Sequence, residues 1–300
     1  MERFYSNGKL LISGEYAVLD GAKSLAMPTR FGQSLEVSVL DVPILIWESF
    51  TCEKQLWFQA EIQLSELHTE SADPKLATLK NILIAAQELN PEFLNDGNGV
   101  FAQTFLTFPN EWGLGTSSTL INNIASWARV DAFQLLQNSF GGSGYDIACA
   151  QNETPITYQI TNNKPSVDAV TFDNNFLDNI YFVYLNQKQD SKEGIQLYRN
   201  TKGEKIQLCE NISEITEKII KSRSLNEFES LLKKHEQLIG DFLNIIPLQQ
   251  QLFQDYPGAI KSLGAWGGDF ILVTGDKQTP NYFSERGFET VISYRDMIIL

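Results

Sequence analysis

A short segment in the middle of the chain, residues 113–119 with the sequence Gly-Leu-Gly-Thr-Ser-Ser-Thr, constrains the fold more than any other. Apolar residues recur every three or four positions from Leu120 to Ala128, which predicts an amphipathic helix that begins here. The first amides of a helix have no partner within it and lie at its positive end, so this junction suits a phosphate. A turn followed by a Ser or Thr cap explains the same residues equally well.

Two common phosphate-binding motifs are excluded at this junction. No Gly-Lys-Ser/Thr follows the glycines, so the segment is not a Walker A loop. The third glycine of a dinucleotide-binding fingerprint is replaced by Ser118, so that motif is absent as well.

Composition narrows the classes of partner. The chain has 300 residues, of which 43% are hydrophobic, enough for a sizeable core and about two domains. Its net charge of −14 makes non-specific binding of nucleic acid unfavourable, because that affinity comes from Lys and Arg neutralising phosphates. A few local cations in a cleft are still enough to bind a small anion.

Cysteines, histidines and hydropathy bear on metal sites and on location. Three separated cysteines and two histidines offer too few ligands for a thiolate or imidazole metal site and no disulfide pattern. We find neither a signal peptide nor an apolar run of about 18 residues. We therefore expect a cytoplasmic protein with a small-molecule substrate, without a membrane or nucleic-acid partner. A homodimer is left open.

The order of elements predicts an α+β fold. The first half alternates apolar and polar residues in strand-like runs, and Asp73-Pro74 is typical of a cap and first turn of a helix that stops before Pro91. An Asn-, Asp- and Pro-rich stretch at 162–179 marks a boundary, from which we expect two domains, 1–165 and 166–300. The elements expected after the boundary are strands at 181–185, 271–273 and 297–300 and helices at 213–221, 224–242 and 248–256.

Two further segments carry charged residues beside glycines. In residues 7–19, Lys9 opens an apolar run and Glu15 follows a glycine; an ordinary strand ending in a turn explains this pattern too. In residues 141–150, Asp146 follows a glycine-rich loop, either as a catalytic base or as a helix cap.

The last two segments lie in the second half. Residues 262–272 place glycines at 264, 267 and 268 before a strand, a pattern that a glycine hairpin also explains. Lys188 and Lys192 stand in a short basic stretch, which is either a contact for an anionic substrate or a solvated loop.

In order, these segments resemble the signature motifs of the GHMP kinases. Residues 8–21 resemble the first motif, 113–118 the phosphate loop, 144–148 the loop of the catalytic aspartate, and 264–269 the third motif. Glu15-Tyr16 and Asp269 are closest to the phosphomevalonate kinase form, since mevalonate kinases usually have Glu-His and Gly at these places.

The resemblance implies a two-domain GHMP kinase fold, with an N-terminal domain like ribosomal protein S5 domain 2 and a ferredoxin-like C-terminal domain. It implies ATP and Mg²⁺ as cofactors, Asp146 and Lys9 as catalytic residues and Ser117 as the magnesium ligand. The ATP-binding residues it implies are Gly113, Leu114, Gly115, Thr116, Ser117 and Ser118. The substrate-binding residues it implies are Glu15, Ser143, Gly144, Lys188, Lys192, Gly264, Gly267 and Gly268.

The chain also departs from the family pattern. Asp131 is the only acidic residue strictly between Ser117 and Asp146, a segment that in mevalonate kinases is longer and carries a second magnesium ligand. Trp266 replaces a glycine, which we expect to crowd the pocket, and Thr119 replaces an alanine.

The expected function is ATP-dependent phosphorylation of a small metabolite on the mevalonate route to isoprenoids. Phosphomevalonate is the first choice of acceptor and mevalonate the second. A catalytically weakened member that binds a nucleotide or metabolite is the alternative from another class.

Overall fold

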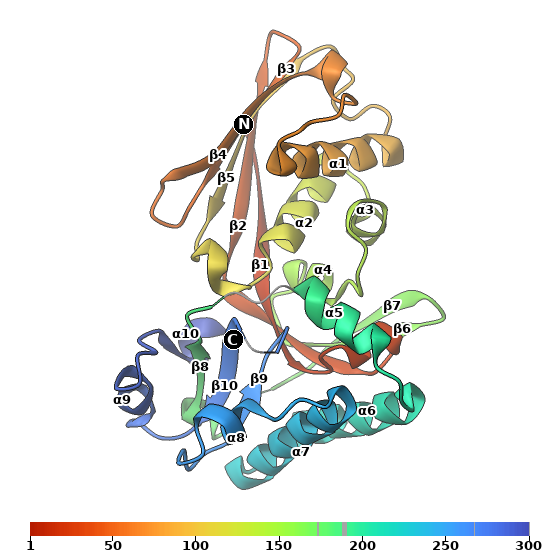
Figure 1. Ribbon diagram of the computed structural model, residues 1–300. Coiled ribbons are helices and arrows are strands. Elements are labelled where there is room, and N and C mark those ends of the chain that lie inside the picture. The colour runs from red at the N-terminus through yellow and green to blue at the C-terminus, as the bar shows by residue number, and fades with distance from the viewer. Residues whose placement is uncertain (173, 188–190, 267, 300) are drawn as a thin grey trace. The chain divides into compact units, whose positions relative to one another are not determined.

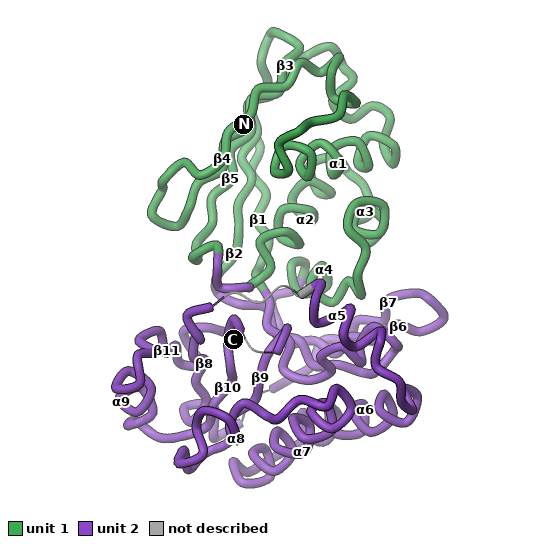
Figure 2. The backbone as a smooth tube through the Cα atoms, in the orientation of Figure 1, with its two compact units in different colours: residues 1–8, 31–110, 114–151 green, residues 9–30, 111–113, 152–300 purple. Residues whose placement is uncertain are grey.

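The computed structural model describes residues 1–172, 174–187, 191–266 and 268–299. They form two compact units, coloured separately in Figure 2. Unit 1 comprises residues 1–8, 31–110 and 114–151, and unit 2 comprises residues 9–30, 111–113 and 152–300. Neither unit is one continuous segment, because the chain crosses between them several times. This division into units does not test the predicted domain bounds 1–165 and 166–300, which stay a prediction.

Unit 1 is a sheet covered by helices. Its strands follow the order β4-β3-β5-β2, with β1 also paired to β2. Strands β3 and β5 run parallel, whereas β4 is antiparallel to β3 and β2 is antiparallel to β5. The alternating burial of β3 reflects a sheet with one face on the core. The strands are β1 (Glu2–Ser13), β2 (Ser24–Leu40), β3 (Ile44–Phe50), β4 (Leu56–Gln63) and β5 (Gly99–Leu106).

The helices of unit 1 pack their apolar sides on that sheet (Figure 1). The predicted cap of the first helix is confirmed, since the Asp73 carboxylate accepts a hydrogen bond from the Lys75 amide at 2.8 Å. The predicted helix after the central glycines is confirmed as well. The helices are α1 (Pro74–Leu89), α2 (Thr116–Ala128), α3 (Ala132–Ser139) and α4 (Tyr145–Ala150), with 3-10 turns η2 (Leu64–Glu66) and η3 (Asn110–Trp112) between elements.

Unit 2 contains a second, antiparallel sheet in the order β11-β8-β10-β9. Unit 2 also contains the other end of the first, seven-stranded sheet, where β2 pairs through Ser24–Ala26 with β6, which pairs with β7. The strands are β6 (Ile156–Thr161), β7 (Lys164–Ala169), β8 (Ile180–Tyr184), β9 (Ile260–Ser262), β10 (Phe270–Thr274) and β11 (Val291–Ser293).

The helices of unit 2 agree only in part with the sequence patterns. One helix begins at Lys205 instead of 213, and the predicted helix 248–256 ends at Leu252. The strand predicted at 297–300 is wrong at its start, because the Ser293 hydroxyl caps a turn of helix that ends at Met297. The helices are η1 (Ala17–Asp20), η4 (Leu177–Asn179), α5 (Ser191–Asn200), α6 (Lys205–Lys221), α7 (Leu225–Leu243), α8 (Leu248–Leu252), α9 (Thr279–Ser284) and α10 (Tyr294–Met297).

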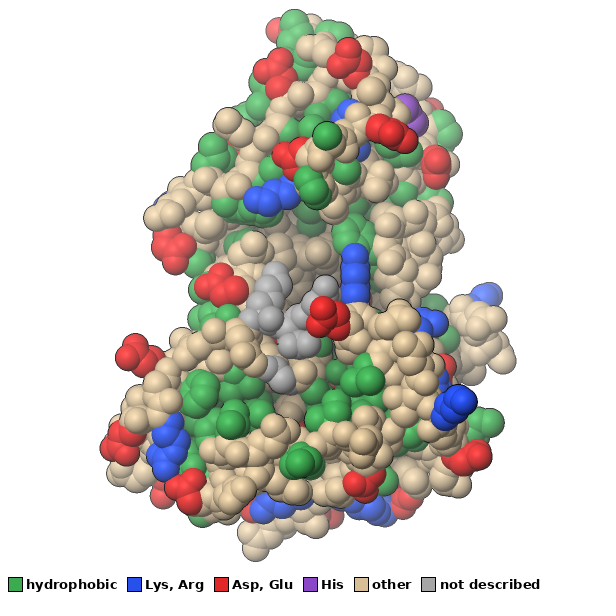
Figure 3. All heavy atoms as spheres, in the orientation of Figure 1, with side chains coloured by type: hydrophobic (Ala, Val, Ile, Leu, Met, Phe, Trp, Pro, Cys, Tyr) green, Lys and Arg blue, Asp and Glu red, His purple; other side chains and the backbone are tan. Residues whose placement is uncertain are grey.

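Helix length and surface charge bear on the possible partners of the chain. Within the described ranges, no helix combines the length and the apolar character that a bilayer crossing requires. Figure 3 shows charged side chains of both signs scattered over the visible face, with no continuous basic band among the described residues there.

Candidate functional site

The N-terminus of α2 is open in unit 1. Gly115 precedes the helix with φ of 98°, and this residue, which has no side chain, provides no side-chain cap. The hydroxyls of Ser118 and Thr119 donate instead to the Gly115 carbonyl, at 2.9 and 3.0 Å. The amides of the first turn have no partner inside the helix and so present a donor surface to an anion.

A buried polar network holds α2 in place. Ser6 donates to Asn123 at 2.7 Å and accepts from Asn122 at 2.9 Å, which ties the helix to β1. Asn123 donates to the Gln33 carbonyl on β2 at 2.9 Å, and Gln151 donates to Asn122 at 2.9 Å. Because these side chains are satisfied by one another, they fix the rotation and height of the open helix end.

Asp146 lies in unit 1, at the second position of α4. Gly144 precedes the helix with φ of 89°, so Asp146 is not the capping residue. Its carboxylate accepts a hydrogen bond from the next amide, that of Ile147, at 3.0 Å. Helices α2 and α4 pack against each other (Figure 1). Unit 1 therefore contains the predicted phosphate loop from Leu114 onward, the predicted loop residues Ser143 and Gly144, and the predicted catalytic aspartate.

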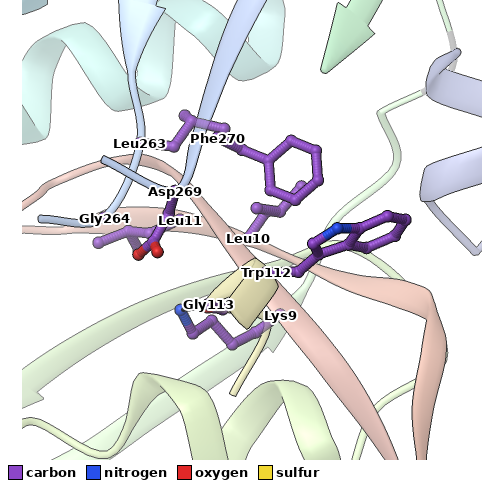
Figure 4. Close-up of a pocket in the computed structure, with 9 residues that line it drawn as sticks. All are labelled: Lys9, Leu10, Leu11, Trp112, Gly113, Leu263, Gly264, Asp269 and Phe270. Atoms are coloured by element: carbon purple, nitrogen blue, oxygen red, sulfur yellow. Dashed lines mark hydrogen bonds between the residues drawn. The ribbon is translucent and has the colours of Figure 1, made fainter. Parts of the chain in front are cut away.

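A small pocket in unit 2 joins three of the predicted segments. The Lys9 ammonium donates to the Gly113 carbonyl at 2.8 Å. Figure 4 shows Lys9 and Asp269 reaching into the same region beside Gly113. The lining residues come from β1, the glycine junction and the hairpin between β9 and β10: Lys9, Leu10, Leu11, Trp112, Gly113, Leu263, Gly264, Asp269 and Phe270.

One glycine-dependent contact and one backbone hydrogen bond shape this pocket. Gly113 has φ of 65°, and a Cβ on it would lie 2.5 Å from the Asp269 carboxyl group. The hairpin closes through a 3.2 Å hydrogen bond from the Leu263 amide to the Phe270 carbonyl. We call residues 263–266, 268 and 269 the third glycine loop. The predicted Gly264 and Gly268 lie in it, whereas the predicted Gly267 lies outside the described residues.

Glu15 occupies a different environment from the one the resemblance implied. Its side chain is 1% exposed and pairs with the buried Lys261 ammonium at 2.5 Å. Protein encloses this carboxylate, and its predicted contact with a substrate stays a prediction. Lys192 belongs to α5 and not to a loop, and Lys188 lies outside the described residues.

Sequence reasoning missed the residues around Glu15. Lys261, His235 and Glu236 are buried beside it, and they stand in stretches whose patterns are those of an ordinary strand and helix. Burial raises the pKa of the Glu236 carboxyl to about 7. Burial and the nearby Lys261 charge hold the pKa of His235 well below its usual range. The only local signal was Lys261, which stands in a mainly apolar stretch, residues 259–265.

The expectation that Trp266 crowds the substrate pocket stays a prediction, since Trp266 is not among the residues that line the pocket beside Gly113. The Trp266 side chain is 8% exposed and packs in an apolar cluster with Tyr16, Tyr198 and residues of α6 and α7. Its amide donates to the Tyr16 hydroxyl at 3.0 Å. The indole therefore anchors the third glycine loop in the core of unit 2.

The residues present offer few metal ligands. Ser117 is exposed at the open end of α2, where its hydroxyl is accessible. Asp131 instead caps α3, accepting from the Gln134 amide at 2.8 Å. Within the described ranges, no three His, Cys, Asp or Glu side chains are grouped as a metal site. The set fits a magnesium ion held mainly by nucleotide phosphates and water, as is usual for this ion.

The comparisons with known proteins are structural. No family model and no curated protein matches the sequence. Mevalonate kinase from Methanococcus jannaschii superposes with a TM-score of 0.73 at 15% identity, covering 100% of this chain and 98% of that one. Phosphomevalonate kinase from Streptococcus pneumoniae, in complex with phosphomevalonate and AMPPNP, gives 0.72 at 17% identity, covering 98% and 100%.

A sugar kinase is similar to the same degree. Galactokinase from Lactococcus lactis, complexed with galactose, gives a TM-score of 0.71 at 14% identity, covering 99% of this chain and 93% of that one. At identities this low, the superpositions show the fold alone. The chain has the α+β fold of the GHMP kinases, as its motifs led us to expect.

Proposed function

We propose that this protein is an ATP-dependent kinase that transfers a phosphoryl group to a small molecule. The observation that carries the proposal is the open N-terminus of α2, which follows Gly113 and Gly115 in a GHMP kinase fold. Phosphoryl transfer requires positioning and charge neutralisation more than covalent chemistry by the protein. An open helix end, one lysine and one carboxylate supply these needs.

Each predicted residue has a role in this reaction. The amides after Gly115 hold the phosphates of ATP, and the Ser117 hydroxyl contributes to a magnesium ion that neutralises their charge. Lys9 stabilises charge on the transferred group. Asp146 orients the acceptor hydroxyl or phosphate and takes its proton.

We propose phosphomevalonate as the acceptor and mevalonate as the second choice. Asp269 supports this order, because the chain has the acidic form of the third motif and its carboxyl group lies against Gly113. The likeness to a solved phosphomevalonate kinase supports it as well. The comparable TM-score of a galactokinase makes a sugar the third acceptor to include in any assay.

An acceptor screen tests the proposal. Purified protein with ATP and Mg²⁺ is incubated with phosphomevalonate, mevalonate, homoserine or galactose, and ADP release is measured with and without acceptor. We expect turnover of about 1 to 100 per second with phosphomevalonate and at least tenfold less with the others. Turnover with mevalonate alone reverses the order of acceptors, and no acceptor-dependent ADP release removes the kinase assignment.

One observation favours a second candidate, a module that binds a nucleotide without turning it over. Asp131, the one acidic residue strictly between Ser117 and Asp146, is engaged as a helix cap. Thermal denaturation with and without ATP and Mg²⁺ separates the candidates. Stabilisation by the nucleotide together with no product from the acceptor panel supports the binding module.

A further inference from the structure

Four ionisable side chains are buried together where β1 ends. Glu15 lies in the turn after β1, Lys261 in β9, and His235 and Glu236 are consecutive residues of α7. Each is at most 2% exposed. Buried charges are unfavourable unless they are paired and hydrogen-bonded, so a cluster of this kind requires a defined geometry.

His235 and Glu236 of α7 each bind a different segment of the chain. His235 Nε2 accepts a hydrogen bond from the Gly14 amide at 2.9 Å. The Glu236 carboxylate accepts from the Ser262 amide at 3.1 Å and from the Ser262 hydroxyl at 2.7 Å. One turn of helix thus holds the turn after β1 through Gly14 and the end of β9 through Ser262, directly before the third glycine loop.

The tautomer of His235 follows from these contacts. Because Nε2 accepts the Gly14 hydrogen, it carries no proton, and the neutral ring is protonated at Nδ1. Its 3.4 Å approach to Glu15 is therefore not an ion pair. The depressed pKa of His235, caused by burial and by the Lys261 charge, agrees with a neutral ring.

Lys261 and Glu15 link strand β9 directly to the turn after β1. The Lys261 ammonium donates to Glu15 and, at 2.9 Å, to the Ser262 carbonyl. The titratable groups that face it are Glu15, Glu236 and His235, and burial raises the pKa of both carboxyl groups. Of these groups, Glu15 is the one that accepts a hydrogen bond directly from the ammonium, although it stands 246 positions away in the sequence.

This pair stands close along the chain to residues that line the pocket. Lys9 stands on β1, six positions before Glu15 in the turn that follows this strand, and Gly264 stands three positions after Lys261. A shift of either segment changes the distance between these two lining residues. We propose that Lys261 and Glu15 are positioning residues, whose buried ion pair sets the third glycine loop against β1 and so shapes the pocket beside Gly113.

The test separates positioning from simple stabilisation. Lys261→Met alone leaves a buried carboxylate unpaired and is expected to be strongly destabilised. The double variant Lys261→Met/Glu15→Gln removes both charges with little change of shape, so it recovers most of the lost stability. The matched control is Lys218→Met/Glu214→Gln, an exposed ion pair on α6 with side chains 53% and 62% exposed.

Two readouts follow once urea unfolding shows that the double variant is folded. Hydrogen exchange of the amides at 262–266 is expected to be about tenfold faster than in the wild type, whereas α1 exchanges as before. With the best acceptor of the screen, kcat is expected to fall about tenfold or more, with the KM for ATP nearly unchanged. The control is expected to match the wild type in both readouts.

The outcomes are distinguishable. A folded double variant with wild-type exchange and wild-type kcat overturns the proposal, and so does faster exchange with unchanged kcat, because the loop position would then not matter to the pocket. The proposal rests on the proposed function only for its kinetic readout. If the wild type has no kinase activity, that function fails, and the exchange comparison alone decides whether the pair sets the loop.

Discussion

The Lys9 ammonium donates a 2.8 Å hydrogen bond to the Gly113 carbonyl, although the two residues stand 104 positions apart in the sequence. This bond ties the strand of the first motif to the start of the glycine junction. It places a positive charge beside the segment that leads into α2. The contact gives Lys9 a structural partner, and substitution can separate that contact from the catalytic role proposed for Lys9.

Replacing Lys9 by Met removes the charge and the hydrogen bond to Gly113. We expect turnover to fall by about a hundredfold to a thousandfold, because charge on the transferred group loses its stabiliser. The measurement is kcat in the ADP assay, together with thermal stabilisation by ATP. The control is Lys23→Met, which removes a lysine paired with Glu217 at the surface. Equal rates for wild type and Lys9→Met would make the first motif purely structural.

Replacing Asp146 by Asn keeps the shape of the side chain and an oxygen that accepts from the Ile147 amide. The variant therefore folds, but it cannot take a proton. We expect turnover to fall by about a thousandfold, within the usual range for loss of a general base. Thermal stabilisation by ATP and Mg²⁺ is expected to stay near the wild-type value. A kcat within twofold of the wild type contradicts the catalytic role.

Replacing Gly113 by Ala tests the close approach at the glycine junction. The residue has φ of +65°, and the new Cβ would lie 2.5 Å from the Asp269 carboxyl group. We expect a loss of about 2 kcal/mol or more in the free energy of unfolding, and loss of stabilisation by ATP. Urea unfolding and thermal denaturation measure these effects.

Gly97→Ala is the matched control for backbone strain. Gly97 has φ of +85°, and a Cβ added to it would meet no atom within 4 Å, so only the strain of about 1 kcal/mol remains. The double variant Gly113→Ala/Asp269→Ala should regain part of the stability, because it removes the atoms that clash. If Gly113→Ala and Gly97→Ala lose the same stability, the contact with Asp269 has no consequence.

Replacing Asp131 distinguishes a helix cap from a metal ligand. Asp131→Ala is expected to lower the free energy of unfolding by about 1 kcal/mol, whereas Asp131→Ser keeps a capping oxygen and most of the stability. The Mg²⁺ concentration that gives half-maximal activity is expected to be the same in all three proteins. A several-fold increase in both variants would instead identify Asp131 as a metal ligand.

Replacing Glu236 by Gln should change how stability depends on pH. Burial raises the pKa of Glu236 to about 7, above its ordinary value of 4.5, so the folded protein binds this proton more tightly than the unfolded chain. Its contribution to the free energy of unfolding is therefore present below about pH 4.5 and is lost as the pH rises through 7. Glutamine has no such proton to lose.

Urea unfolding of both proteins from pH 4.5 to 8 checks this prediction. Relative to Glu236→Gln, the wild type is expected to lose up to about 3 kcal/mol across that range. The contribution of His235 depends on pH in the opposite direction. Because its pKa is lowered in the folded protein, this contribution to stability is lost as the pH falls below 6.5, the ordinary pKa of histidine. Since His235 is present in both proteins, its contribution largely cancels in the difference. A difference that does not vary with pH contradicts the prediction.

Local patterns predicted well wherever an element carries its own signals. Helix α1 begins at Pro74 after the Asp73 cap, and α2 begins directly after Gly115, because caps, glycines and periodicity act over a few residues. Helix α6 begins at Lys205, eight residues before the predicted start. The prediction missed its first two turns because their pattern is mixed and largely polar. The GHMP kinase fold followed from four motifs in order, and the structural comparisons agree with it.

The environment of single side chains was harder to predict. The indole of Trp266 packs in one apolar cluster with residues of α6 and α7, which no local pattern around Trp266 indicates. Asp131 caps α3, the helix that follows it. From the sequence alone it is considered only as a metal ligand, because it stands between two motifs. The roles of the site residues in binding and catalysis stay predictions, which the experiments above address.

The amino-acid sequence by itself determined the glycine junction before α2, the order of the motifs and the fold class, because these depend on residues close together along the chain. Only the tertiary structure decided that Glu15 is an internal partner of Lys261 and that α7 binds both the turn after β1 and the end of β9. These side chains meet because the turn after β1, strand β9 and helix α7 pack together in unit 2. No local pattern encodes such a meeting, since burial and the choice of partner are properties of the packed core.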